Sequence, residues 1–217
     1  GTGSTIAFWN SGTTLGNYIT GSDNNLFYAG TPAANRLVYY DGTNSDQALA
    51  TFQARVNPRE ANSISLMPVF TSSTDLHLAS TNCLLDNQGA PVAGITTDID
   101  GATRDVTTPD IGADEFSASL NTTLAGITGT AVCAYKTVSV SGTTFSSNTC
   151  DLIAKVASSG ANPVAGKVNA CVTLDATQQY FNAEPFVQRH YDIEPLTSNT
   201  TTTSATITLY FTDAEFV

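Results

Sequence analysis

Basic residues are scarce in this sequence. Its 217 residues include only 8 Lys and Arg against 19 Asp and Glu, which gives a formal net charge of −11. Nucleic acids and anionic membranes bind basic surfaces, so this charge balance argues against both as partners. Apolar runs of membrane-spanning length are also absent, as is a basic and then apolar signal peptide at the start. The sequence therefore predicts no nucleic-acid partner and no membrane insertion.

Cysteine spacing gives no zinc signature. No Cys-x-x-Cys pair occurs among the four cysteines, at positions 83, 133, 150 and 171. Free buried thiols and disulfides are both compatible with these positions. One pairing has a geometric basis, because a two-residue hairpin turn at Ser141-Gly142 would place Cys133 opposite Cys150 on antiparallel strands. A Cys133–Cys150 disulfide would agree with an extracytoplasmic compartment.

Abundant Thr, Ser, Asn and Gly favour an all-β fold with many turns. Short apolar runs separated by polar turns near the start of the chain are typical of β-helix rungs. The strongest helical pattern lies at 45–56, where four apolar residues share one face at the helical period. Ser45 or Asp46 would cap this helix, and Asn57-Pro58 would end it.

Residues 98–116, DIDGATRDVTTPDIGADEF, are rich in acidic side chains. Six of the 19 acidic residues of the chain lie here beside a single cation, Arg104. The Gly and Pro residues within the stretch exclude a long helix, and Asp side chains in such turns bond nearby backbone amides. A guanidinium can bridge several carboxylates, so we expect Arg104 to bond Asp98, Asp110 or Asp114 in a segment that closes the fold.

A resemblance to a known family rests on this segment. Its DIDG, Arg104 and DIGADEF elements resemble the closing segment of right-handed parallel β-helix proteins of the pectin-lyase-like type, as secreted by Bacteroidetes. The Leu76-His77-Leu78 stretch, and the predicted helix followed by Asn62-Ser-Ile, also match that family's pattern. The resemblance covers about residues 15–117. It implies terminal β-helix rungs and a secreted or cell-surface location, but no reaction.

Residues 118–130 are small, polar and uncharged, as linkers are. The charge balance shifts there too, because residues 1–117 carry 4 basic and 12 acidic side chains and residues 118–217 carry 4 and 7. We place a domain boundary near Ser117. Runs that alternate apolar residues with Thr or Ser then predict an Ig-like antiparallel β-sandwich over 131–217. Its strands are expected at 131–140, 144–145, 152–157, 168–174, 186–193 and 205–211.

Three stretches of the second domain, Cys150–Val156, Pro185–Pro195 and Ala205–Phe216, carry a second resemblance. They are similar to a C-terminal β-sandwich of large secreted Bacteroidetes proteins, commonly found ahead of a type IX sorting domain. Chains of that kind continue further, so we expect this sandwich to be truncated at Val217. A sheet without its next strand presents an unpaired edge, which predicts weak self-association through the second domain.

The acidic stretch also offers ligands for calcium. Asp98, Asp100 and Asp110 would supply the oxygen atoms, although the spacing of an EF-hand loop is absent. The alternative, which we favour, is a structural role in the closing turn. Calcium is the only cofactor that the sequence suggests. No catalytic residue is predicted, because His77 and His190 come with no Ser or Cys nucleophile motif.

Aromatic residues near the start of the chain suggest a glycan as ligand. Exposed rings stack on sugars, and the candidates are Trp9, Tyr28, Tyr39 and Tyr40, with filling of a β-helix core as the alternative. We expect a non-catalytic part of a secreted or cell-surface bacterial protein with a structural, adhesive or polysaccharide-contacting role. Two other readings stay open. One is the C-terminal part of a carbohydrate-active lyase or glycoside hydrolase whose active rungs lie upstream, and the other is a spacer or sorting module for surface anchoring.

Overall fold

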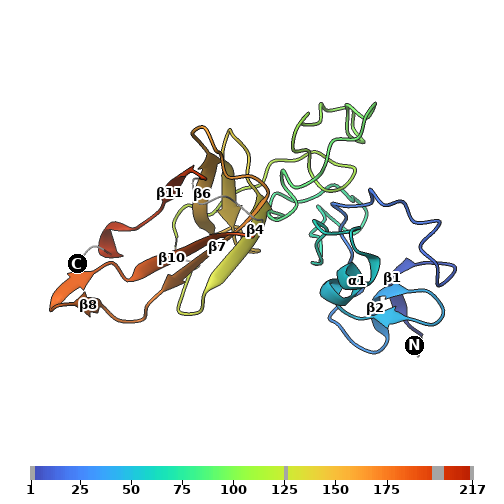
Figure 1. Cartoon of the computed structure of the whole chain (residues 1–217), viewed down its shortest axis with the longest axis horizontal. Coiled ribbons are helices and arrows are strands. Elements are labelled where there is room, and N and C mark those ends of the chain that lie inside the picture. The colour runs from blue at the N-terminus through green and yellow to red at the C-terminus, as the bar shows by residue number, and fades with distance from the viewer. Residues whose placement is uncertain (1–2, 125–126, 197–202, 216–217) are drawn as a thin grey trace. The chain divides into compact units, whose positions relative to one another are not determined.

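The computed structural model describes residues 3–124, 127–196 and 203–215, which divide into two compact units. Unit 1 comprises the chain up to Leu78 together with Leu85–Phe116, and unit 2 comprises Ala79–Leu84 together with the chain from Ser117 onward. Strands and turns dominate both, and the described residues contain one short α-helix (Figure 1). Within those ranges no helix is long and apolar enough to cross a membrane. The all-β class expected from the composition is confirmed.

Unit 1 begins with a parallel pair of strands. β1 (Thr5–Trp9) pairs in parallel with β2 (Arg36–Tyr40), and the short β3 (Ser45–Asp46) joins β2 in antiparallel orientation. An isolated parallel bridge joins Leu26 and Ile64. Two parallel strands need a long connection, because the chain must return to the same end of the sheet before it pairs again. Residues 10–35 form this connection between β1 and β2.

The core of this half of unit 1 is aromatic. The register of β1 and β2 aligns Phe8 with Tyr39, and both rings contact Phe52, at centroid distances of 5.9 and 4.9 Å. The cluster is completed by Leu15, Tyr18, Phe27, Val38, Leu49 and Val56. Aromatic side chains remove large apolar areas from water, and so this cluster supplies much of the stabilisation of the parallel pair.

The helix α1 (Leu49–Val56) supplies its two buried residues to this core, as the helical period predicted. It begins later than expected, at an N-cap, Ala48, that makes no side-chain capping bond. Asp46 lies in β3 instead, where it accepts two hydrogen bonds from Arg55 at 2.6 and 2.8 Å. This bidentate ion pair joins β3 to the last turn of the helix, where a cation also complements the helix dipole.

A buried carboxylate lies at the centre of a hydrogen-bond network after α1. Glu60 is 0% exposed. Its two oxygens accept bonds from the Tyr18 and Ser63 hydroxyls, from the Ser22 hydroxyl at 2.6 Å and from the Asn25 amide at 2.9 Å. Burial by itself would raise the pKa of Glu60, but these donors outweigh it and the pKa lies below its ordinary value. The network therefore keeps an ionised side chain inside unit 1.

The remainder of unit 1, residues 65–116, consists of turns with isolated antiparallel bridges between Phe70 and Leu78 and between Thr97 and Thr103. Regular stacked rungs are not formed in this stretch. Carboxylates organise several of its turns; the Asp105 carboxylate, for example, accepts bonds from the amides of Thr107 and Thr108 at 2.7 and 2.8 Å. Asp favours such turns because its side chain reaches the backbone amides that follow it.

Unit 2 consists of two three-stranded antiparallel sheets that share one hydrophobic core. The sheets have the orders β10-β7-β4 and β11-β6-β5. Their strands are β4 (Val132–Thr137), β5 (Thr143–Ser146), β6 (Leu152–Ser158), β7 (Lys167–Leu174), β10 (Arg189–Pro195) and β11 (Ala205–Leu209). Side chains from both sheets, among them Val172 of β7 and Phe145 of β5, belong to one buried cluster. The six strands agree with the predicted ranges to within three residues at each end.

Two further elements of unit 2 lie outside these sheets. β8 (Gln179–Phe181) and β9 (Glu184–Phe186) form a separate hairpin, which the sequence patterns did not predict (Figure 1). The 3₁₀ turn η1 (Asp213–Glu215) follows β11. Its Glu215 is buried and accepts a bond from Arg189 of β10 at 2.7 Å. This buried ion pair ties the end of the described chain to the first sheet.

The predicted Cys133–Cys150 disulfide is wrong. Cys83 bonds Cys150, and Cys133 bonds Cys171. The Ser141-Gly142 turn does not close a hairpin, because β4 pairs with β7 and β5 pairs with β6. Cys133 still faces a cysteine across an antiparallel ladder, but that ladder belongs to β7. Two disulfides are typical of proteins in an oxidising compartment.

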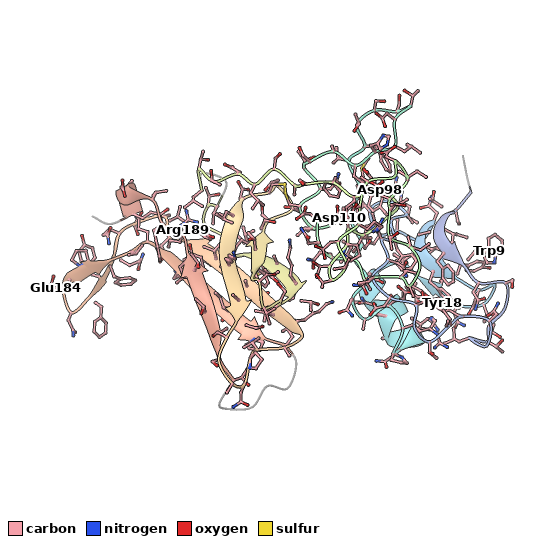
Figure 2. The ribbon with its side chains drawn as sticks, turned by 90° about the horizontal axis from the view of Figure 1, so that it is seen from above. Trp9, Tyr18, Asp98, Asp110, Glu184 and Arg189 are labelled. Carbon is pink, nitrogen blue, oxygen red and sulfur yellow. A yellow bond between two sulfur atoms is a disulfide. The ribbon has the colours of Figure 1, made fainter. Side chains whose placement is uncertain are left out.

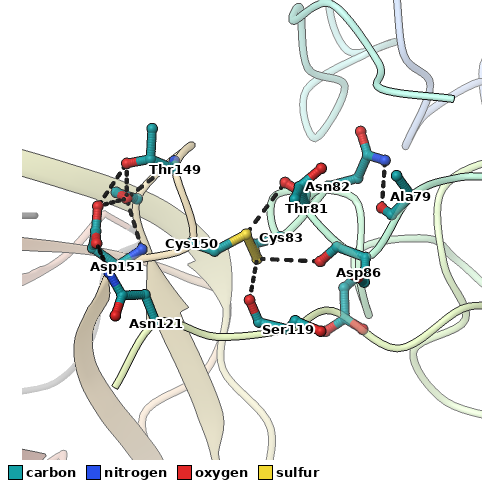
Figure 3. Close-up of a disulfide and its surroundings, with 12 residues drawn as sticks. Ala79, Thr81, Asn82, Cys83, Asp86, Ser119, Asn121, Thr149, Cys150 and Asp151 are labelled. Atoms are coloured by element: carbon teal, nitrogen blue, oxygen red, sulfur yellow. Dashed lines mark hydrogen bonds between the residues drawn. A yellow bond between two sulfur atoms is a disulfide. The ribbon is translucent and has the colours of Figure 1, made fainter. Parts of the chain in front are cut away.

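The disulfide of Cys83 fastens Ala79–Leu84 to the rest of unit 2 (Figure 3). The buried ammonium group of Lys136 donates to the Cys83 carbonyl oxygen at 3.1 Å, and the amide of Ser119 donates to Ser80 at 2.8 Å. Since Leu85 belongs to unit 1 again, the chain crosses between the units at three places along the sequence. The sequence indicated one domain boundary, near Ser117, and did not indicate that Ala79–Leu84 leaves unit 1 to join unit 2. We call this segment the excursion of Ala79–Leu84.

The predicted linker at 118–130 is packed into unit 2 over its described residues. Asn121 forms a parallel bridge with Asp151, and its amide donates to the Cys150 carbonyl oxygen at 2.8 Å. Ile127 is 0% exposed and belongs to the core of the two sheets. Residues 125 and 126 lie outside the described ranges. Most of the described residues of this stretch are exposed, and Leu124 and Ile127 are the two that are buried.

Candidate functional site

The acidic segment at 98–116 is organised by bonds from backbone amides to carboxylates. Asp98 accepts the amides of Asp100 and Ala102 at 2.9 and 2.8 Å with one oxygen, and that of Glu115 at 3.1 Å with the other. Gly101 makes the tight turn possible with a φ of 82°. Partial burial would raise the pKa of Asp98, but the amide donors outweigh it and lower the pKa.

Arg104 holds the end of this segment through carbonyl groups. Its guanidinium donates to the backbone oxygens of Asp110 and Gly112 at 2.7 and 3.0 Å. The carboxylate that it approaches, at 3.6 Å, is that of Glu115. The predicted bond to an Asp side chain is thus corrected, because those carboxylates are occupied by backbone amides. Arg104 nevertheless closes the turn as expected.

Replacing Arg104 with Ala is expected to lower the free energy of unfolding of unit 1 by about 1–3 kcal/mol, because the carbonyl groups of the buried Asp110 and of the exposed Gly112 lose their donor. Urea unfolding followed by Trp9 fluorescence measures this. Arg104→Lys keeps the charge but not the planar fork, so it should recover only part of the loss. Arg36→Ala, at an exposed arginine of β2, is the matched control. An unchanged midpoint for Arg104→Ala would contradict the prediction.

Asp110 is a buried acid and lies outside the group formed by Asp98, Asp100 and Asp114. It is 2% exposed, and its oxygens accept the amides of Asn87 and Phe116 at 2.6 and 2.7 Å. Burial raises the pKa of Asp110 to about 6, and the nearby Asp86 and Glu115 contribute to the rise. A raised pKa means that folding favours the protonated form. The stabilisation linked to Asp110 is therefore present in acid and is lost as the pH rises through about 6.

The carboxylates that do meet are those of Asp98, Asp100 and Asp114, whose oxygens lie within 4.8 Å of one another. Oxygen donors of this kind suit calcium, so Asp114 takes the place that the sequence assigned to Asp110. The neighbouring His77 lies 2.8 Å from an Asp100 oxygen, and its other ring nitrogen contacts Asp75. These carboxylates, Asp75 foremost, raise the pKa of His77 and favour its charged form. When protonated, His77 offsets part of the negative charge of this group.

The predicted aromatic site separates into exposed and buried residues. Tyr39 is 0% exposed and packs on Phe52 in the core, so it cannot contact a ligand. Trp9, labelled in Figure 2, is 66% exposed. Its ring lies edge-on to that of Tyr40 at a centroid distance of 5.6 Å. The register of β1 and β2 pairs these two residues on the outer side of the strands. Tyr28 is 40% exposed.

Unit 1 also contains an apolar cavity that no sequence pattern indicated. Its volume is about 490 Å³. The apolar lining residues are Leu26, Pro68, Phe70, Leu76, Leu78, Leu85, Ile99 and Ile111, with His77 and Asp114 among the polar ones. These residues come from separate turns and show no shared period, so no pattern in the sequence could have identified the cavity.

The chain matches no family model, and no curated protein and no solved structure is significantly similar to it.

Proposed function

We propose that the chain is a non-catalytic part of a secreted or cell-surface protein, and that unit 1 contacts uncharged polysaccharide through Trp9 and Tyr40. The proposal is carried by the 66% exposure of the Trp9 side chain, aligned with Tyr40 on the outer side of two parallel strands. A pyranose ring has an apolar face. Stacking of this face on the exposed Trp9 ring removes apolar surface of both partners from water, which favours binding. The two adjacent rings offer one continuous surface for it.

Charge favours an uncharged ligand. The formal net charge of −11 repels polyanions, and the acidic excess lies mainly in the residues before Ser117. Hydroxyl groups of a neutral sugar can instead bond to the carboxylates and amides of the surface. The two disulfides support the secreted or surface location, because thiols stay reduced in the cytosol.

The pairing of strands supports the interpretation of unit 1 as the end of a right-handed parallel β-helix. Successive rungs of that fold align equivalent residues in columns, and Phe8 with Tyr39 and Trp9 with Tyr40 are two such alignments. The Leu26–Ile64 bridge adds a second parallel contact. The two sheets of unit 2 likewise support an Ig-like sandwich of the kind found towards the ends of surface proteins.

Trp9 is the single tryptophan of the chain, so its fluorescence reports directly on the proposed contact. Titration with a soluble neutral polysaccharide, hydroxyethylcellulose or galactomannan, is expected to shift the Trp9 emission to shorter wavelength as the ring leaves water. Polygalacturonate, a polyanion, is expected to leave the emission unchanged. An emission spectrum that responds to none of the neutral polysaccharides would contradict the proposal.

Substitution provides a second readout that does not depend on fluorescence. In affinity gel electrophoresis, Trp9→Ala is expected to weaken binding to the neutral polysaccharide about tenfold, which corresponds to about 1.4 kcal/mol. Val106→Ala, at an 80% exposed apolar residue of the same unit, is the control and should migrate as the native chain does.

A further inference from the structure

The β8–β9 hairpin carries an aromatic surface that neither sheet of unit 2 uses. Tyr180, Phe181 and Phe186 are 63%, 73% and 46% exposed. Among the described residues, the two strands pair only with each other. Large apolar side chains are usually withdrawn from water, so three exposed rings on so short a hairpin indicate a contact surface.

The turn and the base of the hairpin hold this surface in place. Asn182 and Ala183 have φ values of 51° and 66°, as a two-residue turn with both central residues left-handed requires. At the base, the side chain of Gln178 donates to the carbonyl oxygens of Gln179 and Phe186. The Gln179 side chain donates to Thr177 at 3.0 Å. A surface that is ordered before binding loses less entropy when a ligand arrives.

The register assigns the rings to faces. Phe181 lies opposite Glu184, and Gln179 lies opposite Phe186. Opposed residues share a face of a hairpin and neighbours along a strand alternate, so these four residues lie on one face. By this register, the face carries two phenyl rings on a diagonal together with the carboxylate of Glu184, which is labelled in Figure 2. Tyr180, opposite Pro185, lies on the other face.

Charge decides what this face can bind. Between Ala176 and Gln188 the only ionisable acid or base is Glu184, apart from the Tyr180 phenol, and within the described ranges it has no ion-pair partner. A polyanion would be repelled by it. A bilayer or an apolar protein surface would bury the carboxylate without a donor, at a large desolvation cost. A second copy of this hairpin would bring a second negative charge to the same surface. A hydroxyl-rich ligand avoids that cost, because its hydroxyl groups donate to the carboxylate in place of water.

We propose that the β8–β9 hairpin is a second site for uncharged polysaccharide, in which Phe181 and Phe186 stack on sugar rings and Glu184 accepts bonds from sugar hydroxyl groups. The ligand class rests on the proposed function of unit 1, whereas the site itself rests on the exposure and register of the hairpin. Two sites on one chain raise the apparent affinity for a polymer through the effective concentration of the second site.

The test uses the full chain and affinity gel electrophoresis with hydroxyethylcellulose or galactomannan in the gel. Replacement of both Phe181 and Phe186 with Ala is expected to weaken retardation about tenfold or more. Tyr135→Ala is the matched control, because Tyr135 is an aromatic residue of the same unit with 56% exposure, and it should be retarded as the native chain is. Tyr180→Ala, on the opposite face, should have a smaller effect. Thermal melting of each variant confirms that it is folded.

The outcomes separate this site from that of unit 1. Retardation of the double variant equal to that of the native chain, with the Trp9 response intact, would overturn the hairpin site and leave the unit 1 proposal standing. Loss of retardation while Trp9 emission stays unresponsive would support the hairpin and contradict unit 1. A concentration-dependent dimer in light scattering, or binding to phosphatidylcholine vesicles, that is lost in the double variant without a change in retardation would also overturn the proposal.

Discussion

Glu60→Ala is expected to lower the free energy of unfolding of unit 1 by about 3–5 kcal/mol, because removal of the carboxylate leaves buried donors without an acceptor. Those donors are the Tyr18, Ser22 and Ser63 hydroxyls and the Asn25 amide. Urea unfolding monitored through Trp9, which lies in unit 1, measures the change. The substitution should shift this transition far more than any exposed substitution in the chain.

Two further variants make this result specific. Glu60→Gln keeps the shape of the side chain but places an amide N–H donor among groups that are themselves donors. It should therefore lower the free energy of unfolding of unit 1 by about 1–3 kcal/mol. Glu184→Ala removes an exposed carboxylate and should leave the transition in place. If the Glu60→Ala chain unfolded at the same urea concentration as the native chain, the hydrogen-bond network of Glu60 would not contribute to the stability of unit 1.

The stability contributed by Glu60 should depend on pH in a defined direction. Its hydrogen-bond donors lower the pKa in the folded state below the ordinary 4.5, despite burial. Stabilisation by a group of this kind is present above the unfolded pKa and is lost as the pH falls through the folded pKa. The difference in unfolding free energy between the native chain and Glu60→Gln should therefore narrow as the pH falls below 4.5. A difference that grows in acid would refute the assignment of Glu60 as the ionised centre.

Removal of the Cys83–Cys150 disulfide, with both cysteines replaced by Ser, is expected to lower the free energy of unfolding of unit 2 by about 4 kcal/mol. The bond joins residues 67 apart in the sequence, and closing a loop of that length restricts the unfolded chain strongly. It also fastens Ala79–Leu84, whose carbonyl groups accept hydrogen bonds from the Ser119 amide and the Lys136 ammonium group. Calorimetry under non-reducing conditions measures the loss.

Hydrogen exchange distinguishes the role of this bond from that of the second disulfide. In the Cys83/Cys150 variant, the amides of Asn82 and Ser119 should exchange faster, because their acceptors lie in the released segment. Replacement of Cys133 and Cys171 is the control, since the ladder between β4 and β7 remains and Ala79–Leu84 keeps its own disulfide. Equal protection of Asn82 and Ser119 in the native chain and the first variant would count against the proposed role.

Local patterns predicted much of unit 2. Half-buried antiparallel strands alternate apolar and polar residues, so the six sheet strands could be located from the sequence. The β8–β9 hairpin could not be located in this way, because its aromatic rings lie on both faces and remain exposed, so apolar and polar residues do not alternate. In unit 1 the end of α1 followed from Asn57-Pro58, but its start did not. Asp46, one of the two expected N-cap residues, lies in β3 and forms an ion pair with Arg55 instead of capping the helix.

Consecutive aromatic residues show why the candidate sugar site was only half predictable. Trp9 follows Phe8 and Tyr40 follows Tyr39, and in each pair one ring must face inward. All four are aromatic, so composition cannot decide which. The packing of the two strands against Phe52 decides which ring of each pair faces the core. Tyr39 is buried and Phe8 partly buried there, whereas Trp9 is exposed and Tyr40 half-buried.

The sequence by itself determined the all-β class, the acidic charge and the six sheet strands of the second unit, because composition and the alternation of neighbouring residues set them. Only the tertiary structure decided the disulfides, the excursion of Ala79–Leu84 and the meeting of Asp98, Asp100 and Asp114. These depend on which distant segments become neighbours. Cys133 illustrates the difference, since the rule that opposed strand residues can bridge was correct, but long-range packing chose β7 rather than β5 as the opposing strand.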